Sequence, residues 1–176
     1  MKKVLRTILC VAMIAVLCGC GLPFGGSSDY DGLAMGEKDF RNINIGDSVS
    51  LAKNLETATM TKEMTSEDSL KALLPEGTTI LYYNATVAEC DSKIIYQFDF
   101  DKFVYGSISI KTSDVEKLYS DLTKYYEKSL NDSFVEKTEG NQQGGVIAKD
   151  GKYLMLLKGS NAVTIIVSDK DSFDAM

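Results

Sequence analysis

The fold is decided by residues 79–110, which read TILYYNATVAECDSKIIYQFDFDKFVYGSISI. Three stretches rich in β-branched and aromatic residues, 79–87, 93–100 and 103–110, are separated by short polar turns. Every second residue of the middle stretch falls on one face: Ile94, Tyr96, Phe98 and Phe100. This period of two is typical of strands that bury one side. The segment therefore predicts an antiparallel three-stranded meander.

A helix is predicted directly after this meander. Apolar residues recur there at spacings of three and four, which places them in one stripe along a helix. The stripe consists of Val115, Leu118, Tyr119, Leu122, Tyr126 and Leu130. Ser113 and Glu116 match a capping box at the start of this helix. We interpret the stripe as a core contact with a sheet.

More strands are predicted after the helix, at 134–138, 146–149, 152–158 and 162–168. Asp150-Gly151 favours a tight hairpin, because both residues tolerate a positive φ. Residues 153–157 and 163–167 are almost continuously apolar, which predicts that both faces of the sheet are covered there. The helix would cover one face. Residues 44–77 are the simplest candidate for the other, and a partner protein or a second copy is the alternative.

Short helices are predicted before the meander. Asp47 is a candidate cap for a first helical segment, and Ser66 for a second that ends at Pro75. Together the patterns predict one α+β domain at 44–176. Its antiparallel sheet would consist of strand meanders before and after one long amphipathic helix, with short N-terminal helices.

The first twenty residues have the composition of a secretory signal peptide. Three basic residues within the first six precede an apolar run at 7–18, and the small residue Gly19 follows. The run of twelve residues is shorter than the roughly 20 that a membrane-spanning helix needs. We therefore expect residues 1–19 to be a signal peptide.

The motif Leu17-Cys18-Gly19-Cys20 resembles the lipobox of bacterial lipoprotein precursors. The resemblance implies diacylglyceryl transfer to the Cys20 thiol, cleavage before Cys20, and a mature protein held at the extracytoplasmic face of the cell membrane by lipid. An ordinary signal peptide that is cut before Gly21 or later is the alternative.

The charge of the chain is acidic. It has 19 Lys and Arg against 25 Asp and Glu, a net charge of −6, and loss of residues 1–19 would leave −9. Nucleic-acid binding needs clustered basic residues, so no nucleic-acid partner is expected. Residues 20–43, with Gly and Ser soon after the lipidated Cys20, are predicted to be a flexible tether that holds this acidic domain away from anionic lipid.

Several chemistries are excluded by composition. The chain has no His, which removes Ser-His-Asp and Cys-His catalysis and His-containing zinc sites. Glycine motifs for nucleotide phosphates are absent as well. We predict no metal site and no cofactor. Cys90 would be the only free thiol of the mature chain, and we interpret it as a buried apolar residue.

Four side chains are candidates for a functional site. Asp99 and Asp101 are two residues apart, a spacing that places both carboxylates on one strand face and suits glycoside cleavage, although a solvated strand face looks the same. The chain also has two Tyr-Tyr pairs, and in each pair one ring must point away from its neighbour. Tyr83 or Tyr125 is therefore a candidate for an exposed binding face, and a ring lying flat on the surface is the alternative.

These features favour a non-enzymatic, lipid-anchored envelope protein whose domain binds or scaffolds another envelope component. Its partners would be the membrane, through the lipid on Cys20, and an envelope protein. A hydrolase that cleaves an envelope polymer with its acidic residues is one alternative. A sensor of a small ligand or metal is another.

Overall fold

The computed structural model describes residues 30, 32–67, 74–139 and 142–175. Eight strands form one antiparallel sheet in the order β1-β2-β3-β4-β8-β7-β6-β5. Their bounds are Thr59–Thr65 (β1), Thr78–Val87 (β2), Cys90–Asp99 (β3), Lys102–Lys111 (β4), Val135–Glu139 (β5), Gln142–Lys149 (β6), Lys152–Lys158 (β7) and Ala162–Asp169 (β8). Strands β4 and β8 pair at the centre and join the two halves of the sheet.

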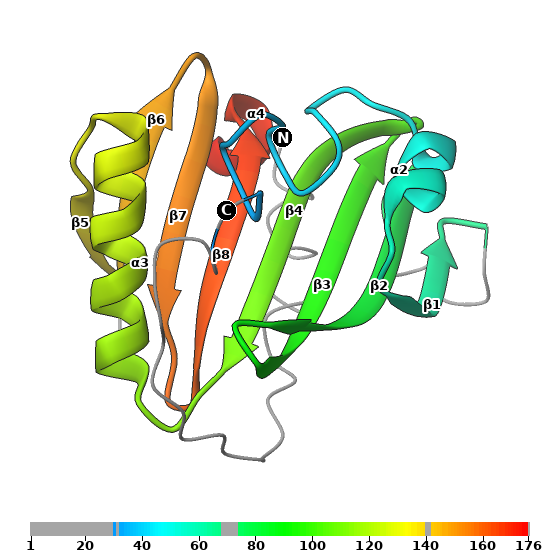
Figure 1. Ribbon diagram of the computed structural model, residues 1–176. Coiled ribbons are helices and arrows are strands. Elements are labelled where there is room, and N and C mark those ends of the chain that lie inside the picture. The colour runs from blue at the N-terminus through cyan, green and yellow to red at the C-terminus, as the bar shows by residue number, and fades with distance from the viewer. Residues whose placement is uncertain (1–29, 31, 68–73, 140–141, 176) are drawn as a thin grey trace.

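The described residues form three helices beside the sheet: α2 (Val49–Leu55), α3 (Val115–Leu130) and α4 (Lys170–Asp174). Helix α3 packs on β7 and β8. Helix α2 lies over the other half of the sheet, on the same side as α3 (Figure 1). None of the described helices is long and apolar enough to cross a membrane.

The predicted α+β class is wrong, because the protein is mostly β. Both meanders belong to one eight-stranded sheet, and the 16-residue helix α3 packs mainly against β7 and β8. Within residues 44–77 the structure has a single seven-residue helix, α2, followed by strand β1. Most of the second predicted short helix, at 68–73, lies outside the described residues.

Strand β1 was missed because it is an edge strand. Its sequence TMTKEMT is exposed over the first five residues. It forms by backbone pairing with β2, from Thr59 opposite Asn84 to Thr65 opposite Thr79. A strand held in this way needs no alternation of apolar and polar residues, so the hydrophobic pattern gives no signal for it.

Two local predictions have different outcomes. The Asp150-Gly151 hairpin is confirmed: both residues have positive φ, 52° and 75°, and they join β6 to β7. The predicted capping box at Ser113 is wrong, because the N-cap of α3 is Asp114, whose side chain accepts a hydrogen bond of 3.0 Å from the Lys117 amide.

The core between the sheet and its helical cover is aromatic. The Phe40 ring meets Tyr96 edge-on at 5.1 Å and stacks with Phe103 at 5.7 Å. A Cβ atom at Gly106 would lie 2.6 Å from the Phe40 ring, so only glycine allows this contact. Phe40 is fully buried and Ile43 nearly so, which means that the core includes part of the segment predicted as a tether.

A buried ion pair fixes α2 to the sheet. Arg41 donates two hydrogen bonds to the Glu56 carboxylate, at 2.6 and 2.8 Å, and the Tyr96 hydroxyl donates a third. The Glu56 side chain is 1% exposed. Burial by itself would raise the pKa of the Glu56 carboxyl, but the hydrogen bonds from Arg41 and Tyr96 hold that pKa below its ordinary value.

Replacement of Arg41 by Ala should lower the free energy of unfolding by about 3 kcal/mol, because Glu56 would be left buried without its cation. Urea unfolding measures the loss. Lys53→Ala is the matched control, since the Lys53–Glu63 pair is exposed and should contribute about 1 kcal/mol or less. Equal losses in the two variants would contradict a structural role for the buried pair.

The same pair predicts a dependence of stability on pH. A carboxyl whose pKa is lowered by folding stabilises the protein above its unfolded pKa of about 4.3. That contribution should disappear as the pH falls through the lower folded pKa of Glu56. Unfolding curves of the wild type should therefore lose stability on the acid side more steeply than those of Arg41→Ala, and parallel curves would contradict the assignment.

Candidate functional site: a groove on the open face of the sheet

One face of the sheet, here called the open face, is covered by little of the described structure, although Ser107 and Ile166 on it are each only 5% exposed. Helices α2 and α3 and the core lie on the other face, and only the short helix α4 reaches the open side, where Phe173 stacks on Tyr153 at 4.1 Å. The prediction that residues 44–77 cover the second face is wrong for their described part. That part lies on the α3 side or pairs at the sheet edge.

Strand pairing arranges the open-face side chains in rows that cross the sheet. One row contains, in order, Lys62, Tyr82, Ile95, Ser107, Ile166, Met155 and Val146. The next row contains Asn84, Lys93, Ser109, Thr164 and Leu157. In the first row the smallest side chain is Ser107 of β4, and in the second row Ser109 of β4 and Thr164 of β8 lie between larger side chains.

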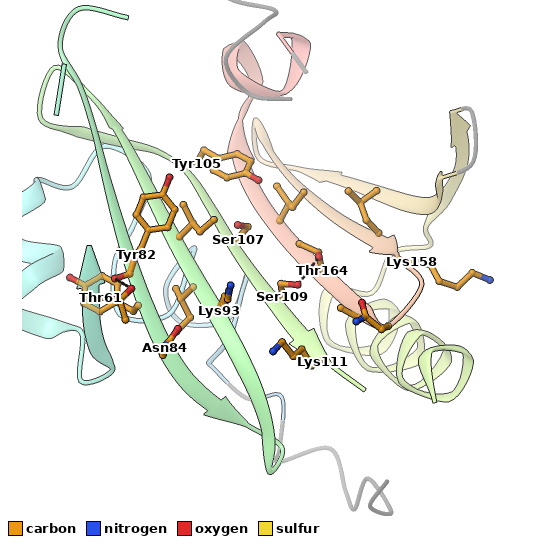
Figure 2. A pocket seen from close by; sticks show the side chains of 18 of the residues that line it. Thr61, Tyr82, Asn84, Lys93, Tyr105, Ser107, Ser109, Lys111, Lys158 and Thr164 are labelled. Atoms are coloured by element: carbon orange, nitrogen blue, oxygen red, sulfur yellow. Dashed lines mark hydrogen bonds between the residues drawn. The ribbon is translucent and has the colours of Figure 1, made fainter. Parts of the chain in front are cut away.

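This size pattern produces a groove along β4, with a volume of about 780 Å³. Ser107 and Ser109 of β4 and Thr164 of β8 form its floor, as Figure 2 shows. Two of the floor hydroxyls contact each other, since Thr164 donates a hydrogen bond of 3.3 Å to Ser109. Small polar side chains therefore line the floor without presenting a charged group.

The walls of the groove are mainly apolar. Tyr82 and Ile95 contribute from β2 and β3, and Ile166 and Leu157 contribute from β8 and β7. Tyr105 lies toward the end near α4 (Figure 2). Burial raises the pKa of both the Tyr82 and the Tyr105 hydroxyls, so these phenols stay neutral at physiological pH.

The charged groups of the groove are all basic. Lys62, Lys93 and Lys111 line it, and no Asp or Glu is among its described lining residues. None of the three forms an ion pair with another described residue. Lys158 also borders the groove, but its amine points away (Figure 2) and pairs with Glu116 at 2.8 Å. A carboxylate-free, basic site is unusual in a chain with net charge −6.

The predicted carboxylate pair does not form on one strand face. Asp99 is the exposed last residue of β3, whereas Asp101 lies in the following turn with a φ of 64°. The Asp101 carboxylate accepts a hydrogen bond of 3.0 Å from the Val49 amide and so caps the start of α2. Asp101 therefore has a structural role in this fold.

The structure places both candidate tyrosines in packed positions. Tyr83 is 3% exposed and meets Tyr96 edge-on at 5.6 Å, so its neighbour Tyr82 is the ring that faces the open side. Tyr125 is half-buried and packs edge-on against Tyr30 at 5.7 Å. Cys90 is buried, which confirms its interpretation as a core residue. Cys20 lies outside the described residues.

The groove itself was missed at the level of sequence, although a signal was present. Residues 106–110 read GSISI, in which isoleucines alternate with serines. Such a strand has one apolar side and one side of small hydroxyls, which predicts a floor that other side chains do not fill.

Neither a metal-ligand cluster nor a similar known protein indicates a further function. No group of three or more His, Cys, Asp or Glu within the described part of the chain is arranged to hold a metal ion. No protein family, curated protein or solved structure matches the chain. The groove and the N-terminal motif are therefore the two features that indicate a function.

The capping role of Asp101 predicts that Asp101→Ala lowers the free energy of unfolding by about 1–2 kcal/mol, since it removes a charged acceptor from a helix N-terminus. Asp99→Ala is the matched control, because Asp99 is exposed, and its change should stay within about 0.5 kcal/mol. Urea unfolding of both variants measures the difference. If neither variant changed the free energy of unfolding, the contact between Asp101 and Val49 would contribute nothing to stability.

Proposed function

We propose that the protein is a lipid-anchored lipoprotein at the extracytoplasmic face of the cell membrane, and that it is a non-enzymatic module that binds an envelope component in its open-face groove. The observation that carries the binding proposal is the groove. It combines an apolar lining and small floor residues with basic groups unopposed by carboxylates. Pockets with mainly apolar walls and a few placed polar groups are typical of binding sites.

The anchor proposal is supported by the lipobox-like motif that ends at Cys20. The described structure begins at Tyr30, ten residues after Cys20. Ten residues reach at most about 35 Å, so a lipid on Cys20 would keep the domain close to the membrane surface. A ligand or partner in the same membrane or in the adjoining envelope would then be within reach of the groove.

Lipidation predicts that Cys20→Ser abolishes incorporation of an alkyne-labelled palmitate and releases the protein from the membrane fraction. Cys18→Ser is the matched control, because Cys18 follows Leu17 rather than a small residue and is a poor lipidation site. In-gel detection of the alkyne together with membrane fractionation measures both effects. Labelling that persists in Cys20→Ser would contradict the anchor.

Binding in the groove predicts site-specific photo-crosslinking in cells. A benzoylphenylalanine in place of Tyr82, in the groove wall, should give discrete adducts that mass spectrometry can identify. The same probe at Lys128, on the exposed side of α3, is the control and should give none. Adducts of equal yield at both positions, or at neither, would overturn the proposal that the groove is the binding site.

A further inference from the structure

The two ends of the groove differ in their chemistry. Lys93 and Lys111 lie toward one end, and Tyr105 lies toward the other (Figure 2). Lys111 is six positions after Tyr105 on β4, which corresponds to about 20 Å along an antiparallel strand. A ligand that fills the groove would therefore have an anionic group at one end and an apolar body along the rest.

The charge at the basic end is available for a ligand. Lys93 and Lys111 project from neighbouring strands, and neither forms an ion pair with another described residue. Asp91 lies two residues before Lys93 on the same face of β3, and the pairing of Ser92 with Ile110 brings it opposite Lys111, but it forms no ion pair with either lysine. The two lysines outnumber this one carboxylate, and a pair of ammonium groups can bind a carboxylate or a phosphate.

The remaining length of the groove favours an alkyl chain over a polar polymer. Its walls are aromatic and aliphatic, from Tyr82, Ile95 and Ile166. Only small hydroxyl groups, those of Ser107, Ser109 and Thr164, offer hydrogen bonds in the floor, and Thr164 already donates its proton to Ser109. The volume of about 780 Å³ is in the range of pockets that hold a single small ligand.

We propose that the groove binds a single-chain anionic amphiphile, with a carboxylate or phosphate head between Lys93 and Lys111 and an alkyl chain that extends along β4 toward Tyr105. This inference rests on the proposed binding function of the same groove and names its ligand class. The carboxylate of a fatty acid and the phosphate of a single-chain phospholipid share this chemistry.

A fluorescence titration tests the proposal. The chain contains no Trp, so Tyr82→Trp introduces one indole into the groove wall as the reporter. The full chain with this change is reconstituted into nanodiscs of zwitterionic phosphatidylcholine. It is then titrated with dodecanoate, dodecyl phosphate and uncharged dodecanol. Saturable binding of at least one anionic probe, at least tenfold tighter than dodecanol, is the expected result, and the better anion identifies the source of the head group.

Two variants locate the bound molecule. Lys93→Gln with Lys111→Gln should weaken binding of the anionic probe at least tenfold, whereas Lys124→Gln with Lys128→Gln, on the exposed side of α3, should leave it unchanged. Ser109→Leu fills the floor and should abolish binding of all probes. Its circular dichroism and unfolding midpoint show whether the variant is folded, and the lysine variants test the site independently.

The outcomes separate this inference from the proposed function. Equal affinity for dodecanol and the anions, or no effect of the Lys93 and Lys111 changes, would overturn the anionic head. Absence of saturable binding by every probe would overturn the amphiphile. If the Tyr82 photo-probe then captured a protein or a glycan, the groove would still be a binding site, and only the proposal of an amphiphile as its ligand would be wrong.

Discussion

The pairing of β4 with β8 is the constraint on which the rest of the structure depends. It joins the N-terminal half of the sheet to the C-terminal half. Because side chains alternate along a strand, it also sets two opposite rows on the central strand β4. Ile108 and Ile110 enter the core, while Ser107 and Ser109 form the groove floor. A shift of one residue would exchange the two sets, so the core and the groove are specified by the same register.

The two faces of the sheet are stabilised differently. The covered face has a tight aromatic core, in which Gly106 allows Phe40 to lie against the strand, and a buried ion pair that joins Glu56 to Arg41. The open face has small side chains at its centre and lysines around it. The groove is therefore locally basic although the chain as a whole carries a net negative charge, and a ligand would meet this local charge.

The sequence predicts much of the local structure but not how the layers are arranged. Alternation and turn residues located the strands of both meanders and the Asp150-Gly151 hairpin. They could not show which strands join the two meanders, since β4 and β8 are far apart in sequence, nor locate β1, which lacks an apolar face. The sequence shows that the rings of Tyr82 and Tyr83 point to opposite faces of the strand. It does not show which ring faces the core, because that depends on how β2 pairs with the rest of the sheet.

The central claim is that the β4 side chains alternate between a covered and an open face, and thiol labelling tests it most directly. Single cysteines replace Ser109 or Lys111 on the open side and Ile108 or Ile110 on the core side. The wild type gives the background labelling of its own four cysteines, Cys10, Cys18, Cys20 and the buried Cys90. A hydrophilic maleimide should modify the first pair rapidly and the second pair only on unfolding. Protection of all four positions in the folded protein would show that the face is covered, and would contradict the account.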